Sequence, residues 1–129
     1  MRILIVDDNM DTAEMLAECL RIRGHEVALA ADAEAALTLV DAFEPSTAVV
    51  DIGLPGMDGY QLASLLRARQ PQLCLIAMTG YGSPADRAHS AEAGFDAHLV
   101  KPIELKKLLE LLSSREKWSA VGEPCIARD

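Results

Sequence analysis

The chain has 129 residues, of which 50% are apolar and 25% are charged, and this composition is typical of one soluble globular domain. Twenty acidic and twelve basic residues give a formal charge of −8, which argues against a nucleic-acid-binding surface. No apolar run approaches the ~20 residues that a membrane helix needs, so we expect no membrane span.

The three cysteines, Cys19, Cys74 and Cys125, are far apart in the sequence. Their spacing contains no CxxC pair, which argues against a zinc site or a disulfide framework. Cys19 and Cys74 lie among apolar residues and are interpreted as small core side chains. The pattern predicts a reducing, cytoplasmic environment.

Short apolar runs alternate along the chain with stretches whose apolar residues recur at helical spacing. The runs predict strands at residues 3–6, 26–30, 47–51, 73–78 and 95–100. The helical stretches are marked by Met15, Leu16, Cys19 and Leu20; by Ala33, Ala36, Leu37 and Val40; by Leu62, Leu65 and Leu66; by the Ala-rich residues 85–93; and by Leu105, Leu108, Leu109 and Leu112.

Strict alternation of five strands with five helices predicts an α/β fold in which helices cover both faces of a parallel sheet. For five strands, the usual arrangement is the flavodoxin-like, doubly wound (βα)5 fold with strand order 2-1-3-4-5. We expect one domain at residues 1–115, followed by a tail or the start of a linker at 116–129.

The ends of the predicted strands are the places to look for chemistry, because ligands of parallel α/β sheets gather at the carboxyl edge. The residues at these ends are Asp7, Asp8, Asp51, Thr79, Lys101 and Pro102. A single aspartate after a strand is usually a turn or helix cap. Three carboxylates together would repel one another unless a cation lies between them, and oxygen ligands favour Mg²⁺, with Mn²⁺ as the alternative.

With such a cation in place, Asp51 is a candidate nucleophile towards phosphorus, since a carboxylate forms an acyl phosphate directly. The cation and Lys101 would neutralise charge on the phosphoryl oxygens, and Thr79 would donate a hydrogen bond to one of them. The residues therefore predict a phosphoryl-transfer site.

Four motifs in this order resemble the response-regulator receiver family, which includes chemotaxis-regulator-like proteins, over about residues 1–115. They are Ile3-Leu4-Ile5-Val6-Asp7-Asp8-Asn9, Asp51-Ile52-Gly53-Leu54-Pro55-Gly56-Met57-Asp58-Gly59, Met78-Thr79-Gly80 and Lys101-Pro102. The segment 95–102 resembles receivers attached to hybrid histidine kinases.

The resemblance implies that Asp51 accepts a phosphoryl group from the phosphohistidine of a sensor histidine kinase or a histidine phosphotransfer protein. It implies that Asp8, Asp51 and the Gly53 carbonyl ligate Mg²⁺ directly, with Asp7 acting through water. Thr79 and Lys101 would contact the phosphoryl oxygens. The Lys101–Pro102 peptide bond is expected to be cis, the alternative being a trans turn proline.

In this family the face formed by the fourth helix, fifth strand and fifth helix reports phosphorylation to a downstream protein target or an attached output domain. His98 occupies the position, three residues before Lys101, where many members carry Tyr or Phe. We hypothesise that His98 is the switch side chain, with pH-sensitive coupling; the alternative is an exposed histidine without a special role. A homodimer is a further expectation, whereas direct nucleic-acid and membrane binding are not expected.

Three other functions compete with this interpretation. Phosphatases of the haloacid-dehalogenase type carry an Asp-x-Asp motif on the first strand, where this chain has Asp7-Asp8-Asn9. A nucleotide or flavin binder would need a Gly-rich motif after that strand. An interaction module that is never phosphorylated would not need the three aspartates Asp7, Asp8 and Asp51. We therefore expect a regulatory domain that catalyses only its own phosphorylation and dephosphorylation.

Overall fold

The structure is a computed structural model that describes residues 1–80 and 93–120. Its elements in chain order are β1 (Arg2–Val6), α1 (Met10–Ile22), β2 (Glu26–Ala30), α2 (Ala33–Phe43), β3 (Thr47–Asp51), α3 (Gly59–Arg69), β4 (Cys74–Thr79), β5 (Ala97–Val100) and α5 (Leu105–Ala120). The helix predicted at residues 85–93 falls almost wholly outside the described residues.

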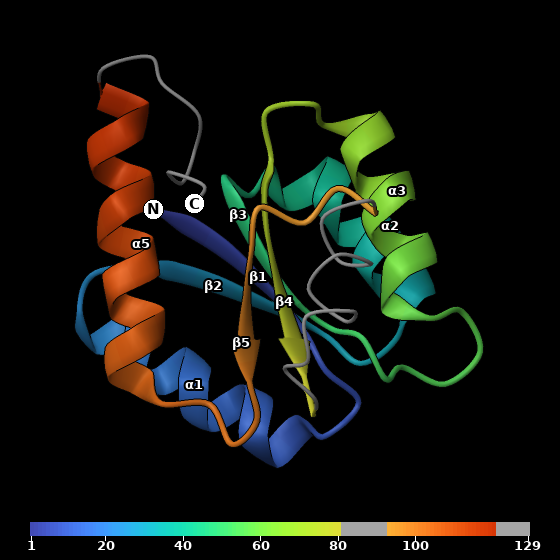
Figure 1. Ribbon diagram of the computed structural model, residues 1–129, viewed down its shortest axis with the longest axis horizontal. Helices are drawn as coiled ribbons and strands as arrows, with labels where there is room; N and C mark the ends of the chain where they lie inside the picture. Colours follow the sequence, from blue (N-terminus) through green and yellow to red (C-terminus); the bar gives the residue numbers. More distant parts are fainter. Residues whose placement is uncertain (81–92, 121–129) are drawn as a thin grey trace.

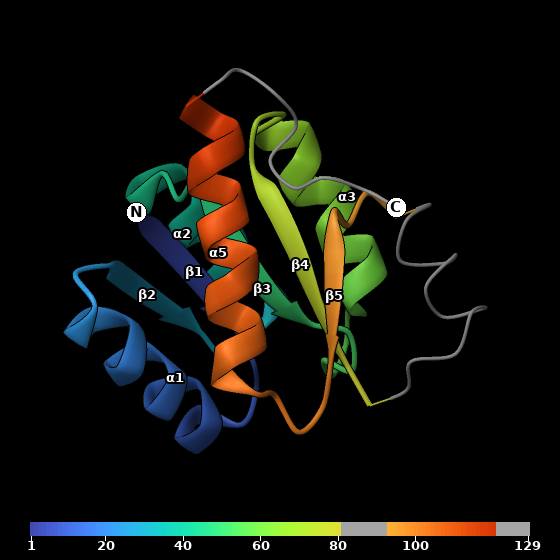
Figure 2. The same cartoon turned by 60° about the vertical axis from the view of Figure 1, so that its left-hand side comes forward.

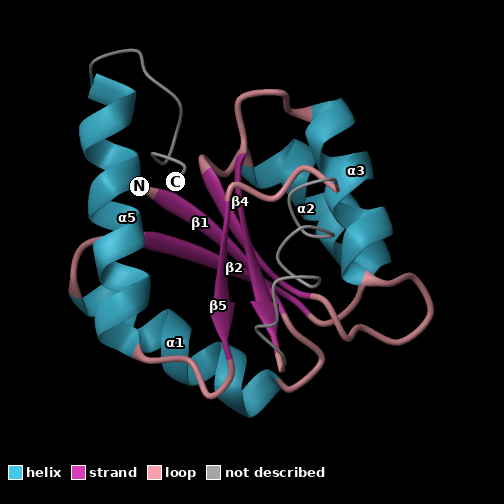
Figure 3. Ribbon diagram, viewed as in Figure 1, coloured by secondary structure: helices cyan, strands magenta, loops and turns pink. Residues whose placement is uncertain are grey.

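The five strands form one parallel sheet in the order β2-β1-β3-β4-β5. Helices α1 and α5 cover one face of this sheet, and α2 and α3 cover the other (Figures 1 and 2). The same layers are separated by colour in Figure 3, where the strands lie between the two pairs of helices. The predicted doubly wound α/β fold and its strand order are confirmed.

Side chains of the central strands alternate between two cores. Leu4, Val6 and Val50 pack with α2 and α3, whereas Ile5 and Val49 pack with α1 and α5. All residues of β3 and β4 are buried, which explains why these strands appear in the sequence as continuous apolar runs rather than as alternating ones.

Each helix that follows β1, β2 or β3 begins at a side-chain cap. Asn9, Asp32 and Asp58 have extended backbones, and their side chains accept hydrogen bonds from the amides of Thr12, Ala35 and Gln61. These caps fix where each helix starts after its strand.

In α1 and α3, one of the apolar residues that predict the helix lies outside its buried face. Met15 is 60% exposed and Leu65 is 41% exposed, although both share helical spacing with buried leucines. In α1 the small residues Ala13 and Ala17 are buried instead.

Helix α5 continues to Ala120, past the domain boundary predicted at residue 115. Among the described residues, no helix combines the length and apolar character needed to span a membrane.

Candidate functional site

The strand order brings the predicted residues to one edge of the sheet. Asp7 follows β1, Asp51 ends β3, Thr79 ends β4, and Lys101 follows β5. These four strands are consecutive neighbours in the sheet, so their carboxyl ends meet. The structure therefore assembles the carboxylates, the hydroxyl and the ammonium that the sequence places at separate strand ends.

Asp51 is the last residue of the central strand and is only 6% exposed. Its two carboxylate oxygens have different partners. Oδ1 accepts a hydrogen bond from the Gly53 amide at 3.0 Å, and Oδ2 lies 3.0 Å from the Lys101 ammonium. These contacts hold the carboxylate in one orientation at the floor of the site.

Lys101 supplies the positive charge of the site. Its Nζ also lies 3.9 Å from Oδ2 of Asp7, so one ammonium serves two carboxylates. The Lys101 amide donates a 2.7 Å hydrogen bond to the Thr79 carbonyl, which joins the ends of β4 and β5. The Lys101–Pro102 peptide bond is cis, as the resemblance implies.

Among the acidic residues that the structure describes, Asp7 is the most deeply buried, with 1% of its surface exposed. Its Oδ1 accepts a hydrogen bond from the Asn9 amide, but Oδ2 has no hydrogen-bond partner among the described residues. Burial raises the pKa of the Asp7 carboxyl, and the nearby charge of Asp51 adds to this effect, whereas the Asn9 amide and Lys101 oppose it. A water molecule or a cation would satisfy an oxygen buried in this way.

Carboxylate oxygens of Asp7, Asp8 and Asp51 lie within 4.8 Å of one another. Asp8 is exposed, so the cluster is open to solvent on one side. An all-oxygen donor set with this excess of negative charge is suited to a hard divalent cation such as Mg²⁺. The donor chemistry, and an Asp7 oxygen that accepts no hydrogen bond, therefore agree with the metal that the sequence predicts.

Gly53, Thr79 and His98 occupy different positions around this edge. Gly53 is exposed on the loop after β3, directly beside Asp51. Thr79 is 7% exposed at the end of β4. His98 is half-buried on β5 rather than exposed, and its register partner on β4 is Ala77. His98 therefore lies on β5 three residues before Lys101, back from the strand ends that form the site.

Two residues of the quoted motifs, Asn9 and Gly59, have structural roles that were not predicted from the sequence. Asn9 caps α1 with its side chain and holds Asp7 with its amide. Gly59 begins α3 in direct contact with the backbone of Asp51 and Ile52. An Asn after the aspartates and an Asp-Gly pair before an apolar helix are the signals that indicate such roles.

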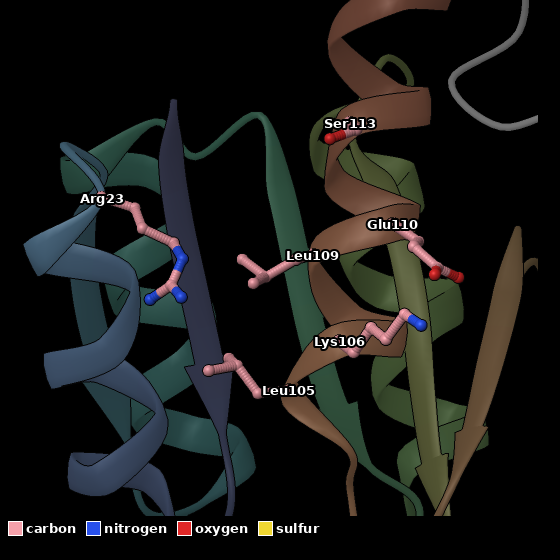
Figure 4. Close-up of a pocket in the computed structure, with 6 residues that line it drawn as sticks. All are labelled: Arg23, Leu105, Lys106, Leu109, Glu110 and Ser113. Carbon is pink, nitrogen blue, oxygen red and sulfur yellow. The ribbon is translucent and has the colours of Figure 1, made fainter.

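A hollow of about 560 Å³ lies away from this edge, between the end of α1 and α5. In Figure 4 the guanidinium of Arg23 points from the end of α1 towards α5, and Leu105 and Leu109 point from α5 towards it. Lys106 and Glu110 point to the other side of α5. The lining contains one carboxylate, from Glu110, so this hollow does not reproduce the charge arrangement at the strand ends.

Comparison with known proteins identifies the family. Residues 3–113 match the family model described as the response regulator receiver domain. The response regulator protein FleR from Pseudomonas aeruginosa is 37% identical over 112 residues, which cover 87% of this chain and 24% of FleR. The curated relatives that the chain matches are longer proteins: it spans 24% of FleR and 49% of the transcriptional regulatory protein TcrA from Mycobacterium tuberculosis.

Solved structures give the same result. A receiver domain protein from Methanospirillum hungatei, described as CheY-like, has a TM-score of 0.87 and 32% identity, covering 94% of this chain and 97% of its own. A response regulator protein from Burkholderia pseudomallei has a TM-score of 0.81 and 30% identity, covering 94% of this chain and 71% of its own. That crystal structure contains a phosphorylated aspartic acid, a calcium ion and citrate.

Proposed function

The chain belongs to the response regulator receiver family of two-component systems, and on that premise we propose that Asp51 is its phosphoryl acceptor. The observation that carries this proposal is that Asp51 is a buried carboxylate that belongs to the acidic cluster and also pairs with the Lys101 ammonium. The phosphorylated aspartic acid in the Burkholderia structure supports the same chemistry. Receiver domains are regulatory, and the only reactions we propose for this one are its own phosphorylation and dephosphorylation.

The phosphoryl group would come from the phosphohistidine of a sensor histidine kinase or a histidine phosphotransfer protein. A bond forms between an Asp51 carboxylate oxygen and phosphorus, and the phosphorus–nitrogen bond of the donor breaks. The donor imidazole keeps the electron pair and takes up a proton. Lys101 neutralises charge on the transferred group, and the Thr79 hydroxyl donates a hydrogen bond to one of its oxygens.

A divalent cation is part of the proposal. Asp8, Asp51 and the Gly53 carbonyl are the proposed direct ligands, and Asp7 acts through water; Mg²⁺ is preferred and Mn²⁺ is the substitute. The cation, when bound, supplies charge neutralisation to the phosphoryl oxygens. The close approach of the three aspartates supports this assignment.

We propose that the signal leaves through the face formed by helix 4, β5 and α5, of which helix 4 lies outside the described residues. His98 is the proposed switch side chain, acting with Thr79. Two observations support a docking face here: Val100 is 43% exposed, and a hollow of about 140 Å³ is lined by His98, Val100, Glu104 and Lys107, among others. The partner is a downstream protein, an output domain of the same protein, or a second copy of this chain.

The remaining expectations about partners and location stay predictions. The acidic balance of the chain favours protein partners over nucleic acid for this domain, although relatives such as TcrA are named as transcriptional regulators. Cys19 and Cys74 are free thiols, and a cytoplasmic location stays a prediction.

One experiment tests the central proposal. The protein is incubated with acetyl phosphate and Mg²⁺, and intact-mass spectrometry is used to detect one added phosphoryl group. We expect Asp51→Asn to abolish the label, whereas Asp11→Asn, which changes an exposed aspartate on α1, should keep it. A label that persists in Asp51→Asn would assign the acceptor elsewhere. Steady hydrolysis of unrelated phosphoesters would favour the phosphatase.

A further inference from the structure

Gly59 is buried where α3 begins, directly behind the proposed acceptor. Its amide donates a 3.0 Å hydrogen bond to the carbonyl of Ile52, the residue after Asp51. Residues 52–58 therefore form a closed loop, with the start of α3 held against the end of β3. The loop carries Gly53, which donates to Asp51.

The space at Gly59 admits no side chain. A Cβ there would lie 2.5 Å from the Ile52 Cα and 2.9 Å from the Asp51 carbonyl oxygen, both far closer than van der Waals contact. Both neighbours are backbone atoms, so no side chain can rotate away to relieve the overlap. The backbone of Gly59 does not have a positive φ, so close packing rather than chain conformation requires the glycine.

We propose that Gly59 is a positioning residue for the phosphoacceptor: the absence of a side chain lets α3 pack on the backbone of Asp51 and Ile52, and this packing fixes the Asp51 carboxylate. The inference rests on the proposed function for the identity of the site. It adds a residue that touches neither the cation nor the phosphoryl group.

The structure gives a short path from Gly59 to the carboxylate. Ile52 is held from two sides, because its amide donates to the Met78 carbonyl at 3.0 Å and its carbonyl accepts from Gly59. The next amide, that of Gly53, donates to Oδ1 of Asp51. A shift of Ile52 therefore moves the Gly53 amide and carbonyl relative to Asp51, and both groups belong to the proposed cation site.

The test is Gly59→Ala, with Mn²⁺ affinity measured by electron paramagnetic resonance of the free ion and the Gly53 amide followed by NMR. We expect the Gly53 resonance to shift and the Mn²⁺ affinity to fall about tenfold or more, as for residues that orient metal ligands. Gly56→Asn is the loop control, because a Cβ at Gly56 meets no atom within 4 Å and asparagine tolerates its φ of +82°.

A fall in Mn²⁺ affinity caused only by lower stability of the fold must be distinguished from one caused by a displaced Asp51 or Gly53. Leu66→Ala opens a cavity in the buried face of the same helix, away from the loop, so it provides a destabilised control that should keep the Mn²⁺ affinity. A second pair tests the docking of α3 without steric overlap, should Gly59→Ala not fold. Asp58→Ala removes the cap of α3, whereas Asp58→Asn keeps a capping oxygen and removes the same charge.

We expect Asp58→Ala to lower Mn²⁺ affinity and shift the Gly53 amide more than Asp58→Asn does. The inference is overturned if Gly59→Ala folds with an unshifted Gly53 amide, or if the two Asp58 variants behave alike. Failure of the proposed function would appear differently, as an absence of Mn²⁺ binding and of Asp51 labelling in the unaltered protein. The NMR comparison still tests the positioning role in that case.

Discussion

The Lys101 ammonium lies 3.0 Å from Oδ2 of Asp51, although the two residues are far apart in the sequence. The same ammonium is 3.9 Å from Asp7, and its side chain is 35% exposed. Lys101 therefore balances part of the negative charge that the three aspartates bring together. A group that pairs with the carboxylate of the proposed acceptor is also suitably placed to contact a phosphoryl group attached to it.

Replacing this ammonium should slow phosphorylation. Lys101→Gln is expected to lower the rate of Asp51 labelling by acetyl phosphate about 10²-fold, because a charged donor to the developing phosphoryl charge is lost. A mass-spectrometric time course gives the rate. Lys107→Gln removes an exposed lysine of α5 and should label at the normal rate, so equal rates in the two variants would contradict the assignment.

Asp7 should reduce stability at neutral pH. The pKa of the Asp7 carboxyl is raised above the ordinary 3.8, chiefly by burial. Between pH 3.8 and this raised pKa, the folded protein therefore binds more protons than the unfolded chain. Its contribution to the free energy of unfolding is thus present at low pH and lost as pH rises through the raised pKa. Asp7→Asn should be more stable at pH 7 by on the order of 1 kcal/mol, with the gain shrinking towards pH 4.

Urea unfolding without divalent cations, repeated from pH 7 to pH 4, measures this difference. Glu18→Gln, which changes an exposed carboxylate away from the ends of α1, serves as the control and should change stability little at either end of the range. A gain from Asp7→Asn that does not depend on pH would show that ionisation of Asp7 is not its cause.

Mg²⁺ should stabilise the folded protein. At a concentration about 100 times its dissociation constant, a ligand specific for the folded state adds ~2.7 kcal/mol to the free energy of unfolding. Asp8→Asn should require a higher Mg²⁺ concentration for the same gain, since it removes a proposed ligand. Urea titrations with Mg²⁺, and with NaCl at matched ionic strength, separate binding from screening; equal gains from both salts would argue against a specific site.

The Arg67–Asp96 pair should contribute more to stability than a surface pair. Asp96 accepts from Arg67 and from the Leu75 amide, and its side chain is 8% exposed. Arg67 also donates to the carbonyls of Leu73 and Gly94, so it joins the start of β5 to the start of β4.

Asp96→Ala is therefore expected to destabilise by about 2 kcal/mol, a figure reduced from that of a fully buried pair because Arg67 is partly exposed. Asp41→Ala breaks the exposed pair with Arg69 and should cost less than ~1 kcal/mol. Thermal or urea unfolding compares the two variants directly, and similar losses would show that the burial of Asp96 does not decide the effect.

The fold and most of the site could be predicted because they depend on local patterns. Continuous apolar runs predict the buried strands. The strand order then predicts that the residues at the carboxyl ends of these runs lie together in the site. Asp7, Asp51 and Thr79 are of this kind. The cis bond before Pro102 followed from family resemblance, not from the physics of the dipeptide.

Other features depend on tertiary packing that a single sequence does not encode visibly. Met15 shares helical spacing with Leu16 and Leu20, yet it is exposed because Ala13 and Ala17 form the rest of the buried face. Alanines contribute weakly to any apolar pattern. Gly59 contacts Ile52, and Arg67 pairs with Asp96. Both contacts join separate helices, strands or loops, and the distance between these is defined only once the backbone has folded.

Strand β3 lies between β1 and β4, so the proposed acceptor has two flanks with separate duties. The β1 flank provides Asp7 and Asp8, which would help to hold the proposed cation, and the β4–β5 flank provides Thr79 and Lys101, which would contact the phosphoryl group. Neighbouring strands are only about 4.8 Å apart, so groups from both flanks lie close to the Asp51 carboxylate. Under the proposed function, substitutions on β5 and α5 that spare Thr79 and Lys101 would change which protein receives the signal and would leave the phosphorylation chemistry intact.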